Sequence, residues 1–130
     1  RGFYQYQSVV PIEHGSDATT EMLNEIKSSG RGSFLAVLKT FGNTPSVGML
    51  SFPRAGVTLA LDFPNRGDET LRLFERLDSI VLEAGGALYP AKDARMSCTM
   101  FESGFPRFDE FLPLRDPGMT SGFSRRVLGF

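Results

Sequence analysis

The clearest pattern of apolar and polar positions lies in residues 34–63, where two runs of strand-forming residues are separated by Gly- and Pro-containing turns. In the first run, residues 34–38 are all apolar and Lys39 follows them directly. Alternate residues of a strand share a face, so we expect this lysine to lie beside three apolar residues: Leu35, Val37 and Phe41. A lysine in an apolar strand loses hydration energy unless its ammonium group reaches water or an anion. Two interpretations stay open: a tip that lies in bulk water, or a cation that faces a ligand in a cleft.

The second run, residues 57–63, follows a turn at residues 53–56. Its odd-numbered residues are apolar and are expected to face the core. The even-numbered positions place Thr58, Ala60 and Asp62 on the opposite face of the strand.

An N-terminal strand is predicted over residues 3–11, which are rich in aromatic and β-branched residues and end at a proline. Gln5 and Gln7 point to the same face of this strand. Each amide can both donate and accept hydrogen bonds, so the pair suits a polyhydroxylated or heteroaromatic ligand. The alternative is a solvated sheet face.

Two helices are predicted between these strands. The first begins with Ser16 or Asp17 as its cap and runs to Ser29, and His14 is expected in the loop before it. The second begins at Asp68 and ends at a Gly-Gly pair. Its apolar residues recur at helical spacing, which is typical of packing against a sheet: Leu71, Phe74, Leu77, Val81 and Ala84.

With a short final strand at Ala87–Tyr89, the order of elements is that of a ferredoxin-like α+β domain with a split β-α-β arrangement. Both helices are then expected on one face of an antiparallel sheet. The other face is left free and carries five polar residues: Gln5, Gln7, Lys39, Thr58 and Asp62.

From Pro90 onward, short helical pieces alternate with helix breakers, over residues 94–102, 105–112 and 121–128. We therefore divide the chain into a domain at residues 1–89 and a C-terminal segment at residues 90–130. The segment holds more aromatic residues than so small a tail is expected to bury, which predicts docking against another domain. These residues are Phe101, Phe105, Phe108, Phe111 and Phe123.

Composition restricts the function classes. The net charge of -1 gives no electrostatic support for binding nucleic acid or an anionic membrane. No apolar run approaches the length of a membrane span, and His14 has no neighbouring cluster of metal ligands. The single cysteine, Cys98, fits a reducing compartment such as the cytoplasm. The chain opens directly into a strand without a methionine, so we expect a piece of a longer polypeptide.

Five segments in order make the chain similar to the C-terminal part of FAD-dependent oxidoreductases of the vanillyl-alcohol-oxidase type. Within that family it most resembles the decaprenylphosphoryl-β-D-ribose 2'-oxidase group and the related aldonolactone oxidases. The segments cover nearly the whole chain and are YQYQSVVP (4–11), FLAVLKTFG (34–42), LSFPRAGVTLALDFP (50–64), GGALYPAKDAR (85–95) and FPRFDEFLPLRDPGMTSGFSRRVL (105–128).

The resemblance implies roles for particular residues. Tyr89 and Lys92 correspond to residues near the flavin, where a cation would stabilise negative charge on the reduced cofactor. We assign no general base, and Lys92 is a catalytic candidate for that role only if its amine is neutral. The substrate pocket would be lined from three strands by Gln5, Gln7, Leu35, Val37, Lys39, Phe41, Thr58 and Ala60.

The implied function is oxidation of a sugar-like secondary alcohol by hydride transfer to FAD. The FAD would be held by an N-terminal domain that this chain lacks, so we expect the isolated chain to be inactive. The mycobacterial ribose oxidases carry asparagine and cysteine where this chain has Thr58 and Ala60, so the substrate stays open between a lipid-linked sugar, an aldonolactone and another alcohol. A lipid-linked substrate would bring the enzyme to a membrane surface. The alternative from another class is a non-catalytic ferredoxin-like module that binds a ligand or partner.

Overall fold

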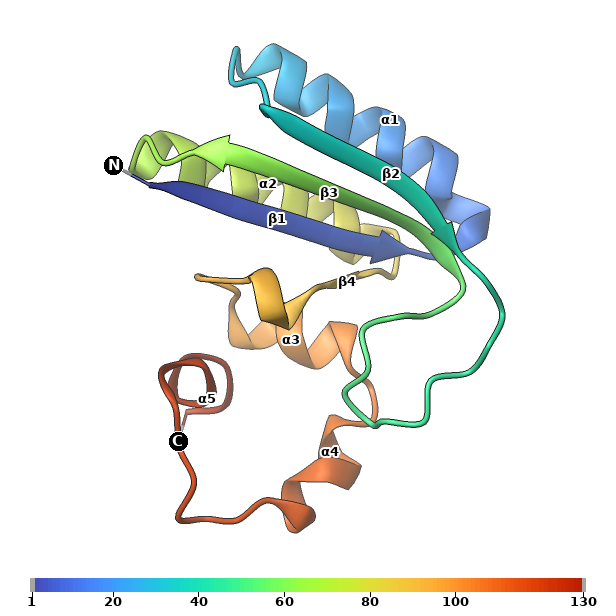
Figure 1. The fold of residues 1–130 in the computed structure, drawn as a ribbon, viewed down its shortest axis with the longest axis vertical. Helices are drawn as coiled ribbons and strands as arrows, with labels where there is room; N and C mark the ends of the chain where they lie inside the picture. The colour runs from blue at the N-terminus through green and yellow to red at the C-terminus, as the bar shows by residue number, and fades with distance from the viewer. Residues whose placement is uncertain (1, 130) are drawn as a thin grey trace.

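Four strands form one antiparallel sheet in the computed structural model, which describes residues 2–129 (Figure 1). The strands lie in the order β2-β3-β1-β4. This is the predicted ferredoxin-like arrangement, with α1 after β1 and α2 after β3. The elements of this domain are β1 (Phe3–Val10), α1 (Ile12–Ser28), β2 (Leu35–Phe41), β3 (Gly56–Pro64), α2 (Asp68–Glu83) and β4 (Ala87–Leu88).

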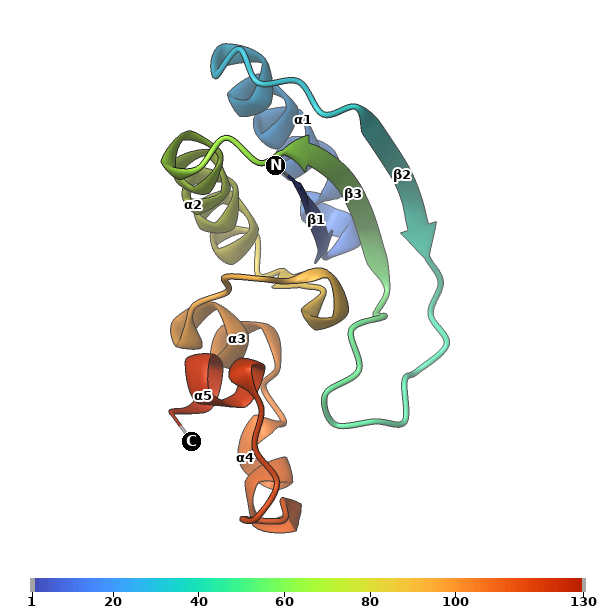
Figure 2. The same cartoon turned by 60° about the vertical axis from the view of Figure 1, so that its left-hand side comes forward.

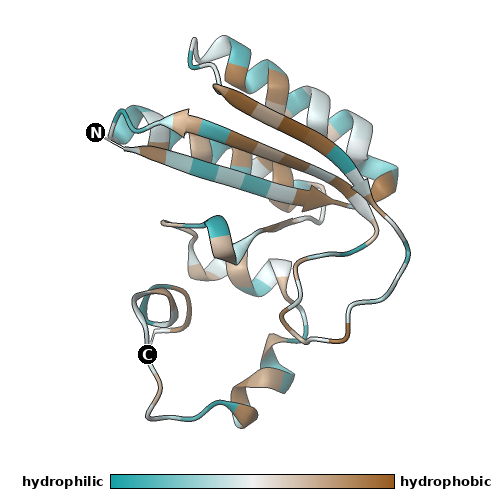
Figure 3. Cartoon of the chain, in the orientation of Figure 1, coloured by the Kyte–Doolittle hydropathy of each residue, from teal (hydrophilic) through white to brown (hydrophobic). Residues whose placement is uncertain are grey.

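Both long helices lie on the same side of the sheet, and Figure 2 shows this layer edge-on. The core between the layers holds the side chains that the strand alternation predicted, including Leu59, Leu61 and Phe63 of β3. Phe74 of α2 stands at its centre, with ring centroids 5.3 Å from Phe63 and 5.2 Å from Tyr6. In Figure 3, strongly hydrophilic bands alternate with paler ones along the middle of β1, as expected for a strand with two different faces.

Helix α1 starts one turn earlier than predicted, and His14 lies within it rather than in a loop. Pro11 ends the strand and serves as the N-cap with φ of -51°, a value that proline favours. Gly15, which precedes the predicted cap, lies within α1 where the helix approaches β3. A Cβ at Gly15 would fall 2.3 Å from Val57 Cγ2, so only glycine fits at this distance. In α2, Asp68 is the first helical residue and makes no side-chain cap.

The segment between β2 and β3 contains no strand. It folds back so that Phe52 packs on the face of the sheet opposite the helices. There it forms a second, small apolar cluster with Val9 and Ala87, against which Phe41 and Tyr89 also pack.

The C-terminal helices are shorter than predicted but lie in the predicted places. The expectation that the tail cannot bury its aromatic residues is wrong for Phe101, Phe105 and Phe108, which are buried within this chain. They lie in α3 and α4 or between them, against β4 and α5, and their rings contact one another. The elements of the segment are η1 (Pro90–Lys92), α3 (Cys98–Gly104), α4 (Phe108–Phe111), η2 (Leu112–Leu114) and α5 (Gly122–Leu128).

None of the helices within residues 2–129 has the length and apolar character that a membrane crossing requires.

Candidate functional site

The sheet face opposite α1 and α2, which we call the open face, collects all the strand residues predicted to meet a substrate. Directly paired residues of antiparallel strands share a face, so the register shows which side chains lie together. Three cross-strand rows result: Leu35–Asp62–Gln5, Val37–Ala60–Gln7 and Lys39–Thr58–Val9. Phe41 follows Lys39 on the same face of β2.

Lys39 is exposed on the open face. Its Nζ lies 5.6 Å from the centre of the Phe41 ring, a contact that leaves most of the ammonium hydration in place. Lys39 forms no ion pair with any residue from 2 to 129. Its charge is therefore free to meet an anionic or polar group above the sheet.

The two glutamines differ in burial and in the hydrogen bonds that their amides make. Gln7 is 8% exposed, and its Nε2 donates a 3.0 Å hydrogen bond to Oγ1 of the buried Thr58. Gln5 is exposed, and its amide makes no hydrogen bond within the described part of the chain. Thr58 thus fixes the orientation of one amide, whereas the other can adapt to what lies above it.

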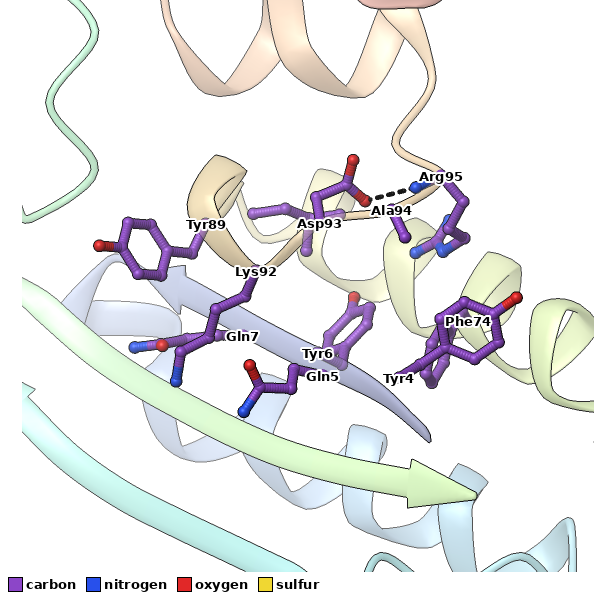
Figure 4. A pocket seen from close by; sticks show the side chains of 11 residues that line it. Tyr4, Gln5, Tyr6, Gln7, Phe74, Tyr89, Lys92, Asp93, Ala94 and Arg95 are labelled. Atoms are coloured by element: carbon purple, nitrogen blue, oxygen red, sulfur yellow. Dashed lines mark hydrogen bonds between the residues drawn. The ribbon is translucent and has the colours of Figure 1, made fainter. Parts of the chain in front are cut away.

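The segment after β4 brings Tyr89 and Lys92 onto the open face. The Tyr89 backbone amide donates to the carbonyl of Gln7 at 2.9 Å, and its ring stacks on Phe52 with a centroid distance of 4.6 Å. Figure 4 shows the Lys92 side chain reaching from η1 over β1 toward Gln5 and Gln7. A small pocket between β1 and this segment is lined by both glutamines, Tyr89 and Lys92.

Beyond Lys92 the chain crosses the edge of β1, and Arg95 reaches the helix-covered face. Its guanidinium forms a two-point ion pair with Asp78 of α2, with distances of 2.6 and 2.7 Å. It also lies over the rings of Phe74 and Tyr6. Burial lowers the pKa of Arg95, but the hydrogen bonds and charge of Asp78 outweigh this and the net shift is upward.

Tyr6 completes this network by donating its hydroxyl hydrogen bond to Asp78 at 3.1 Å. Burial of the phenol, with the nearby Asp78 carboxylate, raises the pKa of Tyr6 well above its usual value of 10.0. The tyrosine therefore stays neutral and acts as a donor.

Asp93 also fixes the segment after β4, through both of its carboxylate oxygens. Its Oδ1 accepts hydrogen bonds from the backbone amides of Arg95 and Met96 at 3.0 and 2.7 Å. Its Oδ2 pairs with Arg126 of α5 at 2.6 Å. Lys92 is thus held between the Tyr89–Gln7 backbone bond and the Asp93 cluster. Sequence reasoning missed this network, because no local spacing connects Asp78, Arg95 and Arg126.

The donor set fits a polyhydroxylated or anionic group rather than a metal. The site offers two ammonium groups and two amides, and residues 2–129 contain no group of three or more His, Cys, Asp or Glu able to hold a metal ion. The ammonium group of Lys92 makes no ion pair within the same residues, and its place beside a flavin stays a prediction.

No family model matches the chain. Among proteins of known sequence, it is 40% identical over 131 residues to decaprenylphosphoryl-beta-D-ribose oxidase of Mycolicibacterium smegmatis. It is also 33% identical over 122 residues to an uncharacterized protein in the mprA 5' region of Streptomyces coelicolor. These matches cover 97% and 89% of this chain, but only 28% and 33% of the two relatives.

The chain therefore spans about a third or less of each of these relatives. The resemblance predicted from five sequence segments is confirmed across nearly the whole chain: the chain is similar to a portion of an oxidase.

Proposed function

We propose that this chain is the substrate-facing portion of a larger FAD-dependent oxidoreductase that oxidises a sugar-like secondary alcohol. The similarity to an oxidase supports the reaction class. The name of that relative includes a ribose unit, which supports a sugar-like substrate.

The observation that carries the proposal is the placement of four polar side chains on the sheet face that α1 and α2 leave free, beside the small cluster around Phe52. Gln5, Gln7 and Lys39 come from two strands, and Lys92 comes from the segment after β4. These two amides and two ammonium groups come from distant parts of the chain, and none of them forms a salt bridge within residues 2–129. Such an arrangement is expected for a ligand site, where polar groups are kept for the ligand.

In this proposal the chain's own residues bind and orient the alcohol. The Gln7 amide, held by Thr58, has its Oε1 left to accept a hydrogen bond from a substrate hydroxyl. Gln5 adapts to a neighbouring hydroxyl, and Lys39 meets an anionic or strongly polar substituent. Leu35, Val37, Phe41 and Ala60 supply the apolar floor between these groups.

Lys92 has two proposed tasks. When bound, FAD supplies the hydride acceptor for oxidation of the carbinol carbon. The Lys92 ammonium would stabilise negative charge that develops beside it. As the candidate base, its amine would take the substrate hydroxyl proton and would thereby become this ammonium group. Tyr89, whose ring stacks on Phe52, lines the site on the same side as Lys92.

We further propose that residues 90–130 pack on the FAD-binding domain of the longer protein. The support is the exposure of Leu114 and Met119, which are 69% and 70% exposed at the edge of a groove formed by η2 and α5. Apolar side chains of this size are more often covered.

A non-catalytic ligand-binding module is the second candidate. It is favoured by the burial of Phe101, Phe105 and Phe108 within the chain itself, since a self-contained domain packs its own aromatic residues. Purification of the longer protein separates the two candidates, because only an oxidoreductase copurifies with a flavin and bleaches it when an alcohol is added.

The test of the site is Lys39→Met in the full-length enzyme, with Lys27→Met as the matched control. Lys27 is an exposed lysine on α1, on the helix side of the sheet. We expect Lys39→Met to lower kcat/KM for the alcohol at least 10-fold while flavin content stays unchanged, and Lys27→Met to change neither. Equal loss of flavin and alcohol oxidation in the Lys39 variant would contradict the assignment.

A further inference from the structure

Strand β2 is an edge strand of the sheet, and it exposes apolar side chains on both of its faces. On the open face, Leu35 and Val37 are 54% and 43% exposed. On the opposite face, Leu38 is 58% exposed. Phe34, just before the strand, is exposed as well, and its ring meets the Phe3 ring edge-on.

On the helix side, α1 stops short of covering β2. It packs on β3 and β1 instead, which leaves a groove between the helix and β2. The groove is lined by apolar groups that include the exposed Ile12 and Leu38. Thr19 also lines it, is 7% exposed, and has a buried Oγ1 with no hydrogen-bond partner among the described residues.

These features are those of an inner strand. Natural edge strands are protected by charges, prolines, bulges or short length, because an exposed apolar edge promotes association. β2 carries Lys39 as its one charged residue over seven positions. Apolar side chains on both faces are typical of strands with neighbours and covering layers on each side.

We propose that β2 is paired in the full-length enzyme with a further β-strand, supplied by the part of the polypeptide that lies outside this chain. This inference rests on the proposed function, in which the chain is one portion of a larger oxidoreductase. The relatives support this source, since two thirds or more of each lies outside its match to this chain.

The added strand has a predicted chemistry and a functional consequence. Its side chains on the helix side are apolar and fill the groove beside Leu38. Its side chains on the open face lie next to Val37 and Lys39, because neighbouring strands are about 4.8 Å apart. The strand would therefore form the wall of the substrate site beyond Lys39.

The test uses the full-length enzyme and measures structure rather than turnover. Amide hydrogen exchange is followed over residues 35–41. An edge strand protects only alternate amides, those that point to β3, whereas a strand paired on both sides protects them all. We expect slow exchange at every amide of β2, by at least 100-fold relative to unstructured peptide, and unchanged when the protein is diluted.

A pair of variants gives a second measure. Leu38→Asp should shift the folding equilibrium at least 30-fold toward the unfolded state, or prevent folding. Leu23→Asp, at an α1 residue of similar exposure (45%), should shift it less than threefold. Fast exchange at alternate β2 amides, or equal tolerance of the two substitutions, would overturn the proposal. Protection that disappears on dilution would overturn it in favour of a second copy of the chain.

These outcomes are independent of catalysis. If β2 is fully protected but Lys39→Met leaves alcohol oxidation intact, the substrate assignment fails and the added strand stands.

Discussion

The two faces of the sheet are made by the same strands, but their polar groups differ: those described on one face are paired with one another, and two charged groups on the other face are not. On the helix-covered face, the hydroxyl of Tyr6, the carboxylate of Asp78 and the guanidinium of Arg95 satisfy one another. On the open face, the ammonium groups of Lys39 and Lys92 make no ion pair within residues 2–129.

The difference separates stability from function. Polar groups that are buried must be paired, because an unpaired one costs about 1–3 kcal/mol. Polar groups that are kept accessible and unpaired contribute little to folding and are available for a ligand. Substitutions on the first face should therefore change the free energy of unfolding, and substitutions on the second face should change substrate use.

The largest effect is expected from Phe74→Ala. Phe74 is 1% exposed and contacts the rings of Tyr4, Tyr6 and Phe63, so its removal leaves a cavity in the core. We expect a loss of about 3–5 kcal/mol in unfolding free energy, measured by urea denaturation. Leu23→Ala is the control, because Leu23 is 45% exposed on α1 and should cost under about 1 kcal/mol. Equal losses would mean that the helix-side core is not the main source of stability.

Arg95→Met should follow, at about 2–3 kcal/mol, because it leaves the half-buried carboxylate of Asp78 without its two-point partner. The matched control is Arg31→Met, which breaks the more exposed ion pair with Glu69 and should cost at most about 0.5 kcal/mol. Chemical denaturation of both variants provides the comparison. A loss for Arg95→Met no larger than that of the control would show that the network does not hold the segment.

Thr58→Val probes a buried polar pair of the open face, formed by Thr58 and Gln7. The substitution removes the acceptor of the Gln7 amide hydrogen bond, and we expect a loss of about 1–2 kcal/mol. It should also raise the KM for the alcohol, because Gln7 is no longer held in one orientation. A variant with unchanged stability and unchanged KM would remove Thr58 from the site.

Tyr6→Phe should cost about 1 kcal/mol at neutral pH through the lost hydrogen bond to Asp78. It should also change the dependence of stability on pH. The folded protein raises the pKa of Tyr6, so the unfolded chain loses this proton first as the pH rises. The contribution of Tyr6 is complete below about pH 10 and declines above it, by up to about 1.4 kcal/mol per pH unit.

Unfolding curves between pH 8 and 11 test this dependence, with Tyr4→Phe as the control, since the Tyr4 hydroxyl makes no hydrogen bond within residues 2–129. The wild type and Tyr4→Phe should lose stability more steeply above pH 10 than Tyr6→Phe. Parallel curves for all three proteins would contradict the assigned shift.

The smallest effect on stability is expected from Lys39→Met. The lysine tip is exposed and unpaired within residues 2–129, so the unfolding free energy should change by less than about 0.5 kcal/mol. Thermal unfolding of the variant checks this. A large loss would mean that Lys39 has a structural role, and the contrast between the two faces would then be weaker.

Local patterns were sufficient to predict the strands and the faces of their side chains. Alternation alone placed Gln5, Gln7 and Lys39 on one face, because the side-chain period of a strand is two and the register follows from the hydrophobic pattern. The ends of elements were harder. Helix α1 was predicted to begin at a capping side chain, whereas Pro11 starts it, and Gly15 is required by the close approach to Val57.

Contacts between distant residues could not be derived in this way. The ion pair of Arg95 with Asp78 forms because the chain crosses the β1 edge after the short strand β4. The hydrophobic pattern of the sequence does not predict this crossing. The burial of Phe101 and Phe105 likewise depends on α3 packing against β4 and α5. Lys92 was assigned from a resemblance, and the structure adds that its side chain reaches toward the two glutamines.

The central claim is that the open face holds the substrate, and the most direct measurement is a crystal structure of the full-length enzyme with a bound alcohol. We predict density for the alcohol above β1 and β3, with its oxygen atoms within 3.5 Å, an ordinary upper limit for hydrogen bonding, of the Gln5 and Gln7 amides and the Lys39 ammonium group. An open face filled by protein side chains, with the alcohol bound elsewhere, would contradict the account.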